Sequence, residues 1–286
     1  MAVKIIVDSG ADILPEECGQ WGMIHLPLRV IFGETEYADA VELSYEAFYE
    51  KLAQSAVLPT TCQVPPENFA RAYDAVLRHG DEAVVITMSG KLSGTYQSAV
   101  IGAMDMPGKI FVVDSENASL GTRILAMRAM ELVNMGMTAQ QIAGVLEGEK
   151  KRIRLFALLD TLEYLKKGGR INTVTAIAGS LLSVKPVIAV EDGAVVMAGK
   201  ARGAKQGQNL LRELVKGTGG IALDKPVCVA YSGTSDEALK RFIDGSPELW
   251  QGYEEELIVA MVGCAIGTHV GPGVIAVAFF ENEGQA

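Results

Sequence analysis

Short apolar runs alternate with helical periodicity through the first half of the chain. Strands are predicted at residues 3–7, 24–32, 83–88, 110–114 and 155–159. Helices are predicted between them, at residues 44–53, 66–79, 95–104, 121–135 and 138–151. Because continuously apolar strands are buried on both faces, their alternation with helices predicts a parallel α/β sheet. In such sheets ligands bind beyond the carboxyl ends of the strands.

The second half of the chain carries hairpin signals in place of this regular alternation. Asp192-Gly193 joins two apolar runs and is typical of a tight β-hairpin turn. Strands are predicted at residues 187–190, 194–198, 227–231, 256–260 and 274–280, and helices at residues 161–167, 173–183, 208–217 and 236–244. We therefore predict two closely packed domains, an N-terminal parallel α/β sheet domain (residues 1–155) and a C-terminal α+β domain (residues 156–286).

Composition and charge narrow the range of functions. Hydrophobic residues make up 49% of the 286 residues and the mean hydropathy is +0.22, which a deep apolar core or an internal apolar cavity explains. The net charge of −10 argues against nucleic acid as a partner, because neutralising phosphates needs clustered Lys and Arg. No apolar stretch is long enough, without polar interruption, to span a bilayer, so no stable membrane insertion is expected.

The N-terminus and the cysteines indicate the compartment. The first apolar run reaches a turn directly after Asp8, which indicates a first strand and not a signal peptide. Cys18, Cys62, Cys228 and Cys264 lie far apart and form no Cys-x-x-Cys pair. They are predicted to be reduced thiols in a cytoplasmic protein.

Three segments rich in small residues carry the candidate chemistry: Thr60–Gln63, Ser89–Thr95 and Gly267–Gly273. Each is predicted to form a loop or turn in which hydroxyls and backbone N–H groups face one small anionic group. The carboxylates are scattered along the chain, so a metal site or a paired-acid glycosidase finds no support. The pattern favours a protein that holds a ligand by a polar head.

Ser89–Thr95 lies between a predicted buried strand and a predicted helix. Ser89 or Ser93 is a candidate N-cap of that helix. The same hydroxyls and N–H groups also suit an anion at the positive end of the helix dipole. The segment lacks the upstream glycine of a Walker A motif and the Ser or Thr directly after Lys91, so no nucleoside triphosphate site is predicted.

Cys62 and His269 leave an enzymatic alternative open. Thr60–Gln63 can start a capped helix with Cys62 as a structural thiol, or it can supply Cys62 as a nucleophile. His269 can act as a base for Ser93 or Cys62, or it can hydrogen-bond a bound carboxylate. The alternative function is therefore an esterase or thioesterase, although the sequence contains no Gly-x-Ser-x-Gly elbow.

A basic run, Lys200-Ala201-Arg202-Gly203-Ala204-Lys205, stands out in this acidic chain. It is either a solvated loop or a docking patch for an anionic partner. Its sequence alone does not separate the two interpretations.

Together these motifs resemble the DegV family, the fatty-acid-binding proteins that serve as the acyl-carrying subunit of bacterial fatty acid kinase. The resemblance covers essentially the whole chain. It rests on Val7-Asp8-Ser9, Thr60-Thr61-Cys62-Gln63, Ser89-Gly90-Lys91-Leu92-Ser93-Gly94-Thr95, Lys167-Gly168-Gly169-Arg170-Ile171, Lys185-Pro186, Gly199-Lys200-Ala201-Arg202-Gly203 and Gly267-Thr268-His269-Val270-Gly271-Pro272-Gly273.

The resemblance implies a two-domain protein that holds a long-chain fatty acid in an apolar tunnel. The residues it places around the carboxylate are Thr61, Cys62, Ser93, Gly94, Thr95 and His269. Thr61 and Ser93 are expected to hydrogen-bond the carboxylate, and Arg202 is expected on the surface that meets an ATP-binding fatty acid kinase subunit. That partner would convert the carboxylate to an acyl phosphate, so the chain itself is expected to be a carrier with no cofactor, metal or ATP site.

Cys62 and Val64 depart from the resemblance, because the family usually has Ser and Pro at these positions. Two other hypotheses remain beside the carrier. One is the esterase or thioesterase, and the other is a regulatory module without a ligand.

Overall fold

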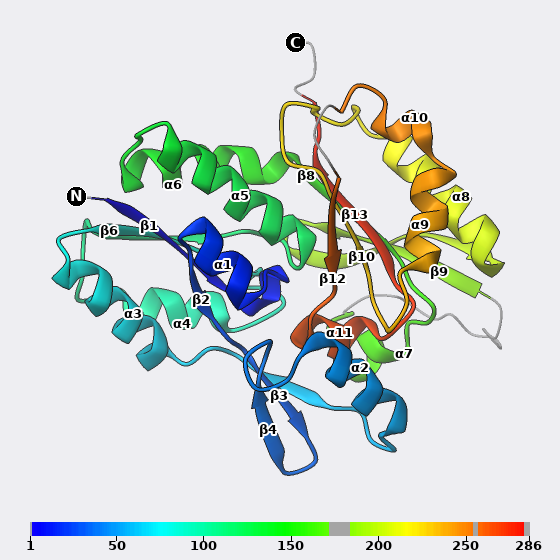
Figure 1. Ribbon diagram of the computed structural model, residues 1–286, viewed down its shortest axis with the longest axis horizontal. Helices are drawn as coiled ribbons and strands as arrows, with labels where there is room; N and C mark the ends of the chain where they lie inside the picture. The colour runs from blue at the N-terminus through cyan, green and yellow to red at the C-terminus, as the bar shows by residue number, and fades with distance from the viewer. Residues whose placement is uncertain (1, 172–183, 254–256, 283–286) are drawn as a thin grey trace.

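The computed structural model describes residues 2–171, 184–253 and 257–282, which form a mixed α/β structure with three sheets (Figure 1). The first sheet is entirely parallel and has the order β2-β1-β6-β7. Its strands are β1 (Val3–Asp8), β2 (Ile24–Leu26), β6 (Glu82–Thr87) and β7 (Ile110–Asp114). Every residue of β6 is buried, as expected for a continuously apolar strand inside a parallel sheet. The predicted N-terminal parallel sheet is confirmed.

The second sheet is mixed and has the order β10-β9-β8-β13-β11-β12. Its strands are β8 (Ile153–Leu158), β9 (Val184–Glu191), β10 (Ala194–Arg202), β11 (Cys228–Tyr231), β12 (Ile258–Met261) and β13 (Ile275–Phe280). β9 and β10 form the predicted hairpin, in which Asp192 and Gly193 have φ of 47° and 76°. Positive φ at both central residues matches the right-handed twist of the flanking strands.

A third, small sheet was not predicted. It contains β3 (Arg29–Phe32), β4 (Thr35–Ala38) and β5 (Thr60–Cys62) in the order β4-β3-β5. The predicted strand over residues 24–32 is therefore two strands, β2 and β3, which belong to different sheets. Pro27 separates them because it has no N–H to donate to a ladder. Thr60–Gln63 does not start a helix, since β5 pairs with β3.

Eleven α-helices and two short 3-10 helices, Ser9–Ala11 and Lys150–Arg152, lie among the described residues. The α-helices are α1 (Pro15–Trp21), α2 (Tyr45–Gln54), α3 (Pro66–Arg78), α4 (Thr95–Gly102), α5 (Leu120–Asn134), α6 (Ala139–Glu149), α7 (Glu163–Lys167), α8 (Gly203–Lys216), α9 (Glu237–Asp244), α10 (Pro247–Trp250) and α11 (Cys264–Val270). Ser44 caps α2 as predicted, since its Oγ accepts a hydrogen bond from the N–H of Ala47. None of the helices among the described residues combines the length and apolar character that crossing a membrane requires.

Helix α5 packs between the two large sheets (Figure 1). It contacts β1 and β6 of the first sheet and β8, β11 and β13 of the second. Its residues are buried nearly all round, which suits a helix that has a sheet on either side. Helices α3 and α4 pack on the first sheet, and α8 packs on the second. One hydrophobic cluster contains Ile5 and Ala276, which come from different sheets. The domain boundary near residue 155 stays a prediction, although β8 begins the second sheet close to it.

Two segments that were expected to be loops are regular structure. Residues 264–270 form helix α11, so His269 is a helical residue and not part of a glycine-rich loop. The basic run at residues 200–205 is the end of β10 and the start of α8. The predicted helix at residues 173–183 lies entirely outside the described residues.

Candidate functional site

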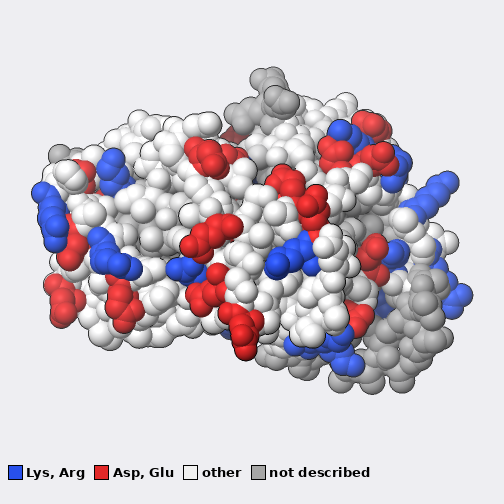
Figure 2. Space-filling view, turned by 60° about the horizontal axis from the view of Figure 1, so that its bottom comes forward, with Lys and Arg blue, Asp and Glu red and all other residues white. Residues whose placement is uncertain are grey.

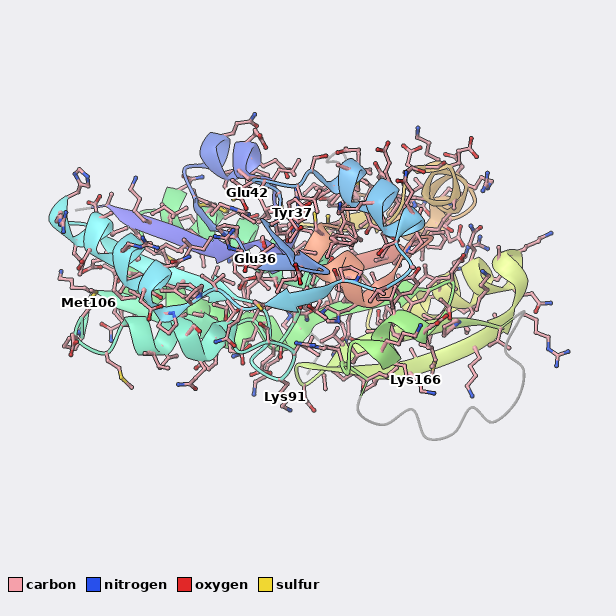
Figure 3. The ribbon with its side chains drawn as sticks, turned by 90° about the horizontal axis from the view of Figure 1, so that it is seen from below. Glu36, Tyr37, Glu42, Lys91, Met106 and Lys166 are labelled. Atoms are coloured by element: carbon pink, nitrogen blue, oxygen red, sulfur yellow. The ribbon has the colours of Figure 1, made fainter. Side chains whose placement is uncertain are left out.

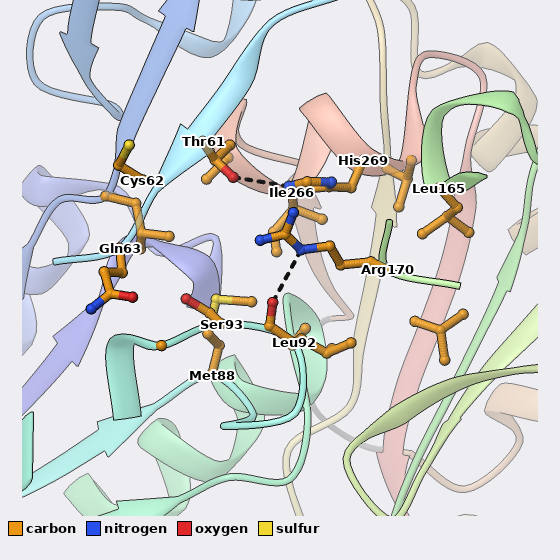
Figure 4. A pocket seen from close by; sticks show the side chains of 16 residues that line it. Thr61, Cys62, Gln63, Met88, Leu92, Ser93, Leu165, Arg170, Ile266 and His269 are labelled. Carbon is orange, nitrogen blue, oxygen red and sulfur yellow. Dashed lines mark hydrogen bonds between the residues drawn. The ribbon is translucent and has the colours of Figure 1, made fainter. Parts of the chain in front are cut away.

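A cavity of about 300 Å³ lies where elements of both large sheets, the small sheet and α11 meet (Figure 4). Most of its lining is apolar. The residues that line it are Leu28, Thr61, Cys62, Gln63, Met88, Leu92, Ser93, Gly94, Ala118, Leu165, Arg170, Val195, Ala265, Ile266, His269 and Val270. The cavity thus combines residues of the first 155 positions with residues of β10, α7 and α11. It also brings together five of the six positions expected around a carboxylate, Thr95 being the exception.

Thr61 and His269 form the central polar contact of the cavity. Thr61 lies on β5 and His269 near the end of α11, and Thr61 Oγ1 is 2.9 Å from His269 Nε2 (Figure 4). Strand alternation turns Thr61 and Cys62 to opposite faces of β5. Cys62 is exposed, and its side chain points away from His269 in Figure 4.

The imidazole of His269 is largely buried. Burial, together with the positive charge of Arg170, lowers the pKa of His269 to about 4, so the ring is neutral near pH 7. Its Nδ1 has no hydrogen-bond partner among the described residues. Gly168 packs directly against the ring, because a Cβ at that position would lie 2.2 Å from Nδ1. The absence of a side chain at residue 168 is what allows the imidazole to reach Thr61.

Ser93 and Gly94 enter the cavity from the turn that precedes α4. Gly94 is the N-cap residue of α4, so neither Ser89 nor Ser93 takes that position. Ser93 Oγ accepts a hydrogen bond from the N–H of Thr95 and lies 2.9 Å from Thr95 Oγ1. Thr95 is buried behind Ser93 and does not line the cavity. Ser89 is engaged elsewhere, since its hydroxyl donates to the carbonyl of Gly193 in the β9–β10 turn.

Gln63 holds this turn in place. Its Nε2 donates to Ser98 Oγ on α4 at 2.8 Å. A Cβ at residue 94 would lie 1.9 Å from Gln63 Oε1, so only a glycine leaves room for the amide. Lys91, in the same Ser89–Thr95 segment, is exposed and points outward (Figure 3).

Arg170 is a cavity residue that the sequence analysis did not assign to the site. Its Nε donates to the carbonyl of Leu92 at 3.2 Å (Figure 4). Its Nη1 donates to the carbonyl of Gly168 at 2.7 Å. Both acceptors are neutral, so the guanidinium brings a positive charge to the polar end of the cavity. The motif Lys167-Gly168-Gly169-Arg170-Ile171 contained a signal for this residue. Paired glycines let the backbone pack closely against the site, and the Arg that follows them is then held near it.

The geometry does not pair either candidate nucleophile with a base. His269 Nε2 is within hydrogen-bond distance of Thr61, while Ser93 Oγ bonds within its own turn. A Ser or Cys nucleophile requires the base within about 3 Å of its side-chain oxygen or sulfur. Arg202 lies outside the cavity, exposed at the end of β10.

The fold is a mixed α/β structure, and its cavity has an apolar interior and a polar end. The chain belongs to the DegV family: the family model described as "Uncharacterised protein, DegV family" matches residues 2–282. A DegV domain-containing protein of Deinococcus radiodurans is 33% identical over 282 residues, which cover 97% of this chain and 98% of that protein. Protein DegV of Bacillus subtilis is 31% identical over 281 residues, which cover 97% and 98% of the two chains.

Solved structures of the family have the same fold. A DegV family protein of Thermus thermophilus, described as fatty acid binding, is 32% identical and superposes with a TM-score of 0.87 over 99% of this chain and 100% of that one. A stearic acid-binding protein of Eubacterium ventriosum is 26% identical, with a TM-score of 0.85 and 98% of each chain covered. The resemblance inferred from the motifs is therefore confirmed.

Proposed function

We propose that this protein binds a long-chain fatty acid, with the acyl chain in the apolar cavity and the carboxylate at Thr61, Ser93 and Arg170. The observation that carries the proposal is the cavity itself, which joins hydroxyl and guanidinium donors to a mostly apolar lining. Family members described as fatty acid binding share the fold along nearly the whole chain. Each buried methylene of an acyl chain contributes about 0.8 kcal/mol.

A carboxylate suits the polar end because it accepts hydrogen bonds and donates none. The candidates that face it are the hydroxyls of Thr61 and Ser93 and the guanidinium of Arg170. Hydrogen bonds in which one partner is charged are shorter and about twice as strong as neutral ones. Cys62 is too exposed to contribute in the same way.

We infer that His269 acts on the ligand through Thr61. Nδ1 of His269 has no hydrogen-bond partner among the described residues. If the proton of the neutral ring is on Nε2, Nδ1 is an acceptor without a donor. If the proton is on Nδ1, a buried N–H group has no acceptor. Buried N–H groups without a partner are the rarer of the two. In the Nε2–H form, the imidazole donates to Thr61 Oγ1, and the Thr61 hydroxyl proton is left to point at the carboxylate. The pair then selects an acceptor as head group.

The finer proposal is that a partner kinase phosphorylates the bound carboxylate. A surface groove of about 600 Å³ lies beside the cavity and shares Thr61, Arg170 and His269 with it. Its outer wall includes Val57 and Lys167, which are both exposed. This groove supports the proposal because it leads from the surface to the carboxylate end. An ATP-using partner would place the complex in the cytoplasm.

Arg202 is the residue we assign to docking of that partner. Acidic and basic side chains are interspersed on the face shown in Figure 2. Docking would therefore depend on a local basic segment and not on the electrostatic potential of the whole protein. Residues 200–205 supply Lys200, Arg202 and Lys205 within six positions, all of them exposed. An anionic partner surface would match this segment.

Head-group selectivity tests the binding proposal. Delipidated protein is titrated with palmitate, hexadecanol and methyl palmitate by competition with a fluorescent fatty acid. Palmitate should bind at least about tenfold more tightly than the other two, since only it makes charge-assisted hydrogen bonds. Equal affinity for the three compounds would show that no carboxylate site exists at this end of the cavity.

A further inference from the structure

Helix α11 carries much of the site, yet it is too short to be stable by itself. It has seven residues, and Ala265, Ile266, His269 and Val270 all line the cavity. Isolated helices of this length do not form in water, so tertiary contacts have to hold it. The contacts at its N-terminus therefore decide where the His269 ring lies.

Asp39 supplies the decisive contact from a distant part of the chain. Its carboxylate accepts hydrogen bonds from the N–H of Cys264 at 3.1 Å and from the N–H of Ala265 at 3.2 Å. These are two of the N–H groups that a helix leaves without partners, and the N-cap residue Gly263 has no side chain to satisfy them. Burial raises the pKa of Asp39, and the hydrogen bonds from Ser9, Cys264 and Ala265 oppose that rise; in its ionised form the carboxylate also complements the helix dipole.

The carboxylate of Asp39 joins α11 to a second wall of the cavity. Ser9 donates its hydroxyl to Asp39 at 2.8 Å and accepts the N–H of Leu28, a cavity residue, at 3.0 Å. Asp39 and Ser9 are both completely buried. Ala40, directly after Asp39, has φ of 61°, a left-handed conformation that residues with a side chain rarely adopt. Strained backbone of this kind persists where the surroundings fix it, and it is concentrated near functional sites.

Further contacts hold the turn before α11. The N–H of Gly263 donates to Asp12 at 3.0 Å, and Tyr49 donates its hydroxyl to the carbonyl of Val262 at 2.9 Å. Gly267 packs on Tyr49, because a Cβ there would lie 2.6 Å from the phenol oxygen. These contacts fix the residues that precede α11. Asp39, in contrast, accepts hydrogen bonds from two N–H groups of the helix itself.

We propose that Asp39 is a positioning residue of the site, which fixes the first turn of α11 and thereby places His269 Nε2 against Thr61. Asp39 itself does not line the cavity. The proposal rests on the proposed function only for its effect on fatty acid affinity, since the placement of His269 can be measured without any ligand.

The ligand-free test uses NMR titration of His269 in wild type, Asp39→Asn and Ser246→Ala. Asn at residue 39 turns an N–H₂ group toward one of the helix N–H groups, so at least one of the three hydrogen bonds is lost. Ser246 is equally buried, accepts a hydrogen bond from Arg212 and directly precedes α10, which is well separated from α11 in Figure 1. Its variant therefore reports general destabilisation. In Asp39→Asn the His269 pKa should rise by at least about one unit toward its ordinary value, because a displaced ring is rehydrated. Ser246→Ala should leave it unchanged.

A double-mutant cycle adds the functional readout. Asp39→Asn should weaken palmitate binding about tenfold in the wild-type background and less than about twofold in a His269→Gln background. An unchanged His269 pKa in Asp39→Asn, or equal losses of affinity in both backgrounds, would overturn the proposal. If no variant or wild type binds palmitate, the proposed function fails while the NMR result still decides the role of Asp39. Should Asp39→Asn not fold, Ser9→Ala removes one donor to Asp39, leaves both helix contacts, and should give a smaller shift in the same direction.

Discussion

Removing the Thr61 hydroxyl tests the polar end of the cavity with little change of shape. Thr61→Val keeps the β-branched side chain, which β-strands favour, and so preserves β5. It removes the hydrogen bond to His269 and the donor that we assign to the carboxylate. The change acts on a partly buried residue that lies between the cavity and the surface groove.

The magnitude follows from the charge of the acceptor. A hydrogen bond to a charged group contributes about 1.5–3 kcal/mol, so the Kd for palmitate should rise by about 10- to 150-fold. Affinity for hexadecanol should change less, since its head group is uncharged.

The assay is competition binding with delipidated protein, accompanied by a melting curve for each variant. Thr35→Val is the matched control, because Thr35 is an exposed residue of β4 in the same small sheet and does not line the cavity. It should leave the Kd within about twofold of wild type. The reasoning is refuted if Thr61→Val binds palmitate as tightly as wild type, or if Thr35→Val loses as much affinity.

Three further outcomes are expected. Gly168→Ala should displace the imidazole of His269 and weaken palmitate binding. Gly144→Ala is the control, because nothing lies within 4 Å of a Cβ added at that helical glycine, and it should leave binding unchanged. Equal Kd values for the two variants would contradict the packing argument. Burial raises the pKa of Asp12 from 3.8 to about 8, so the folded state binds more protons than the unfolded state between about pH 4 and pH 8, and this group lowers stability as the pH rises through that window. Chemical denaturation of Asp12→Asn should therefore show a smaller loss of stability from pH 5 to pH 8 than wild type, and parallel curves would argue against it. If the proposed kinase partner docks at Arg202, Arg202→Glu should reduce acyl phosphate formation with that partner and leave the Kd for palmitate unchanged. A matching loss of both would place Arg202 in ligand binding.

The fold was predictable where local pattern and tertiary structure agree. The apolar runs at residues 83–88 and 110–114 are strands because both faces of a parallel sheet are covered, and the Asp192-Gly193 turn carries its own conformational signal. β5 was missed because it has three residues and its partner β3 lies about 30 positions earlier in the chain. Nothing within Thr60–Gln63 itself records that pairing.

The site was predictable in composition and less so in geometry. Ser93 and His269 were candidates from their own segments and Thr61 was one from the family resemblance, and the structure brings all three to one cavity. The glycines at residues 267 and 271 suggested a loop, whereas Gly267 is required by its contact with Tyr49. Helix α11 forms there because Asp39, 225 residues away in sequence, bonds its first N–H groups. Such long-range contacts leave no local signal.

The most direct test of the central claim is to purify the protein, denature it and identify any released lipid by mass spectrometry. The account predicts a free long-chain fatty acid in an amount close to one per chain, and a reduced amount in Thr61→Val. Reproducible absence of fatty acid, together with no uptake of added palmitate by the folded protein, would contradict the assignment of the cavity to an acyl chain.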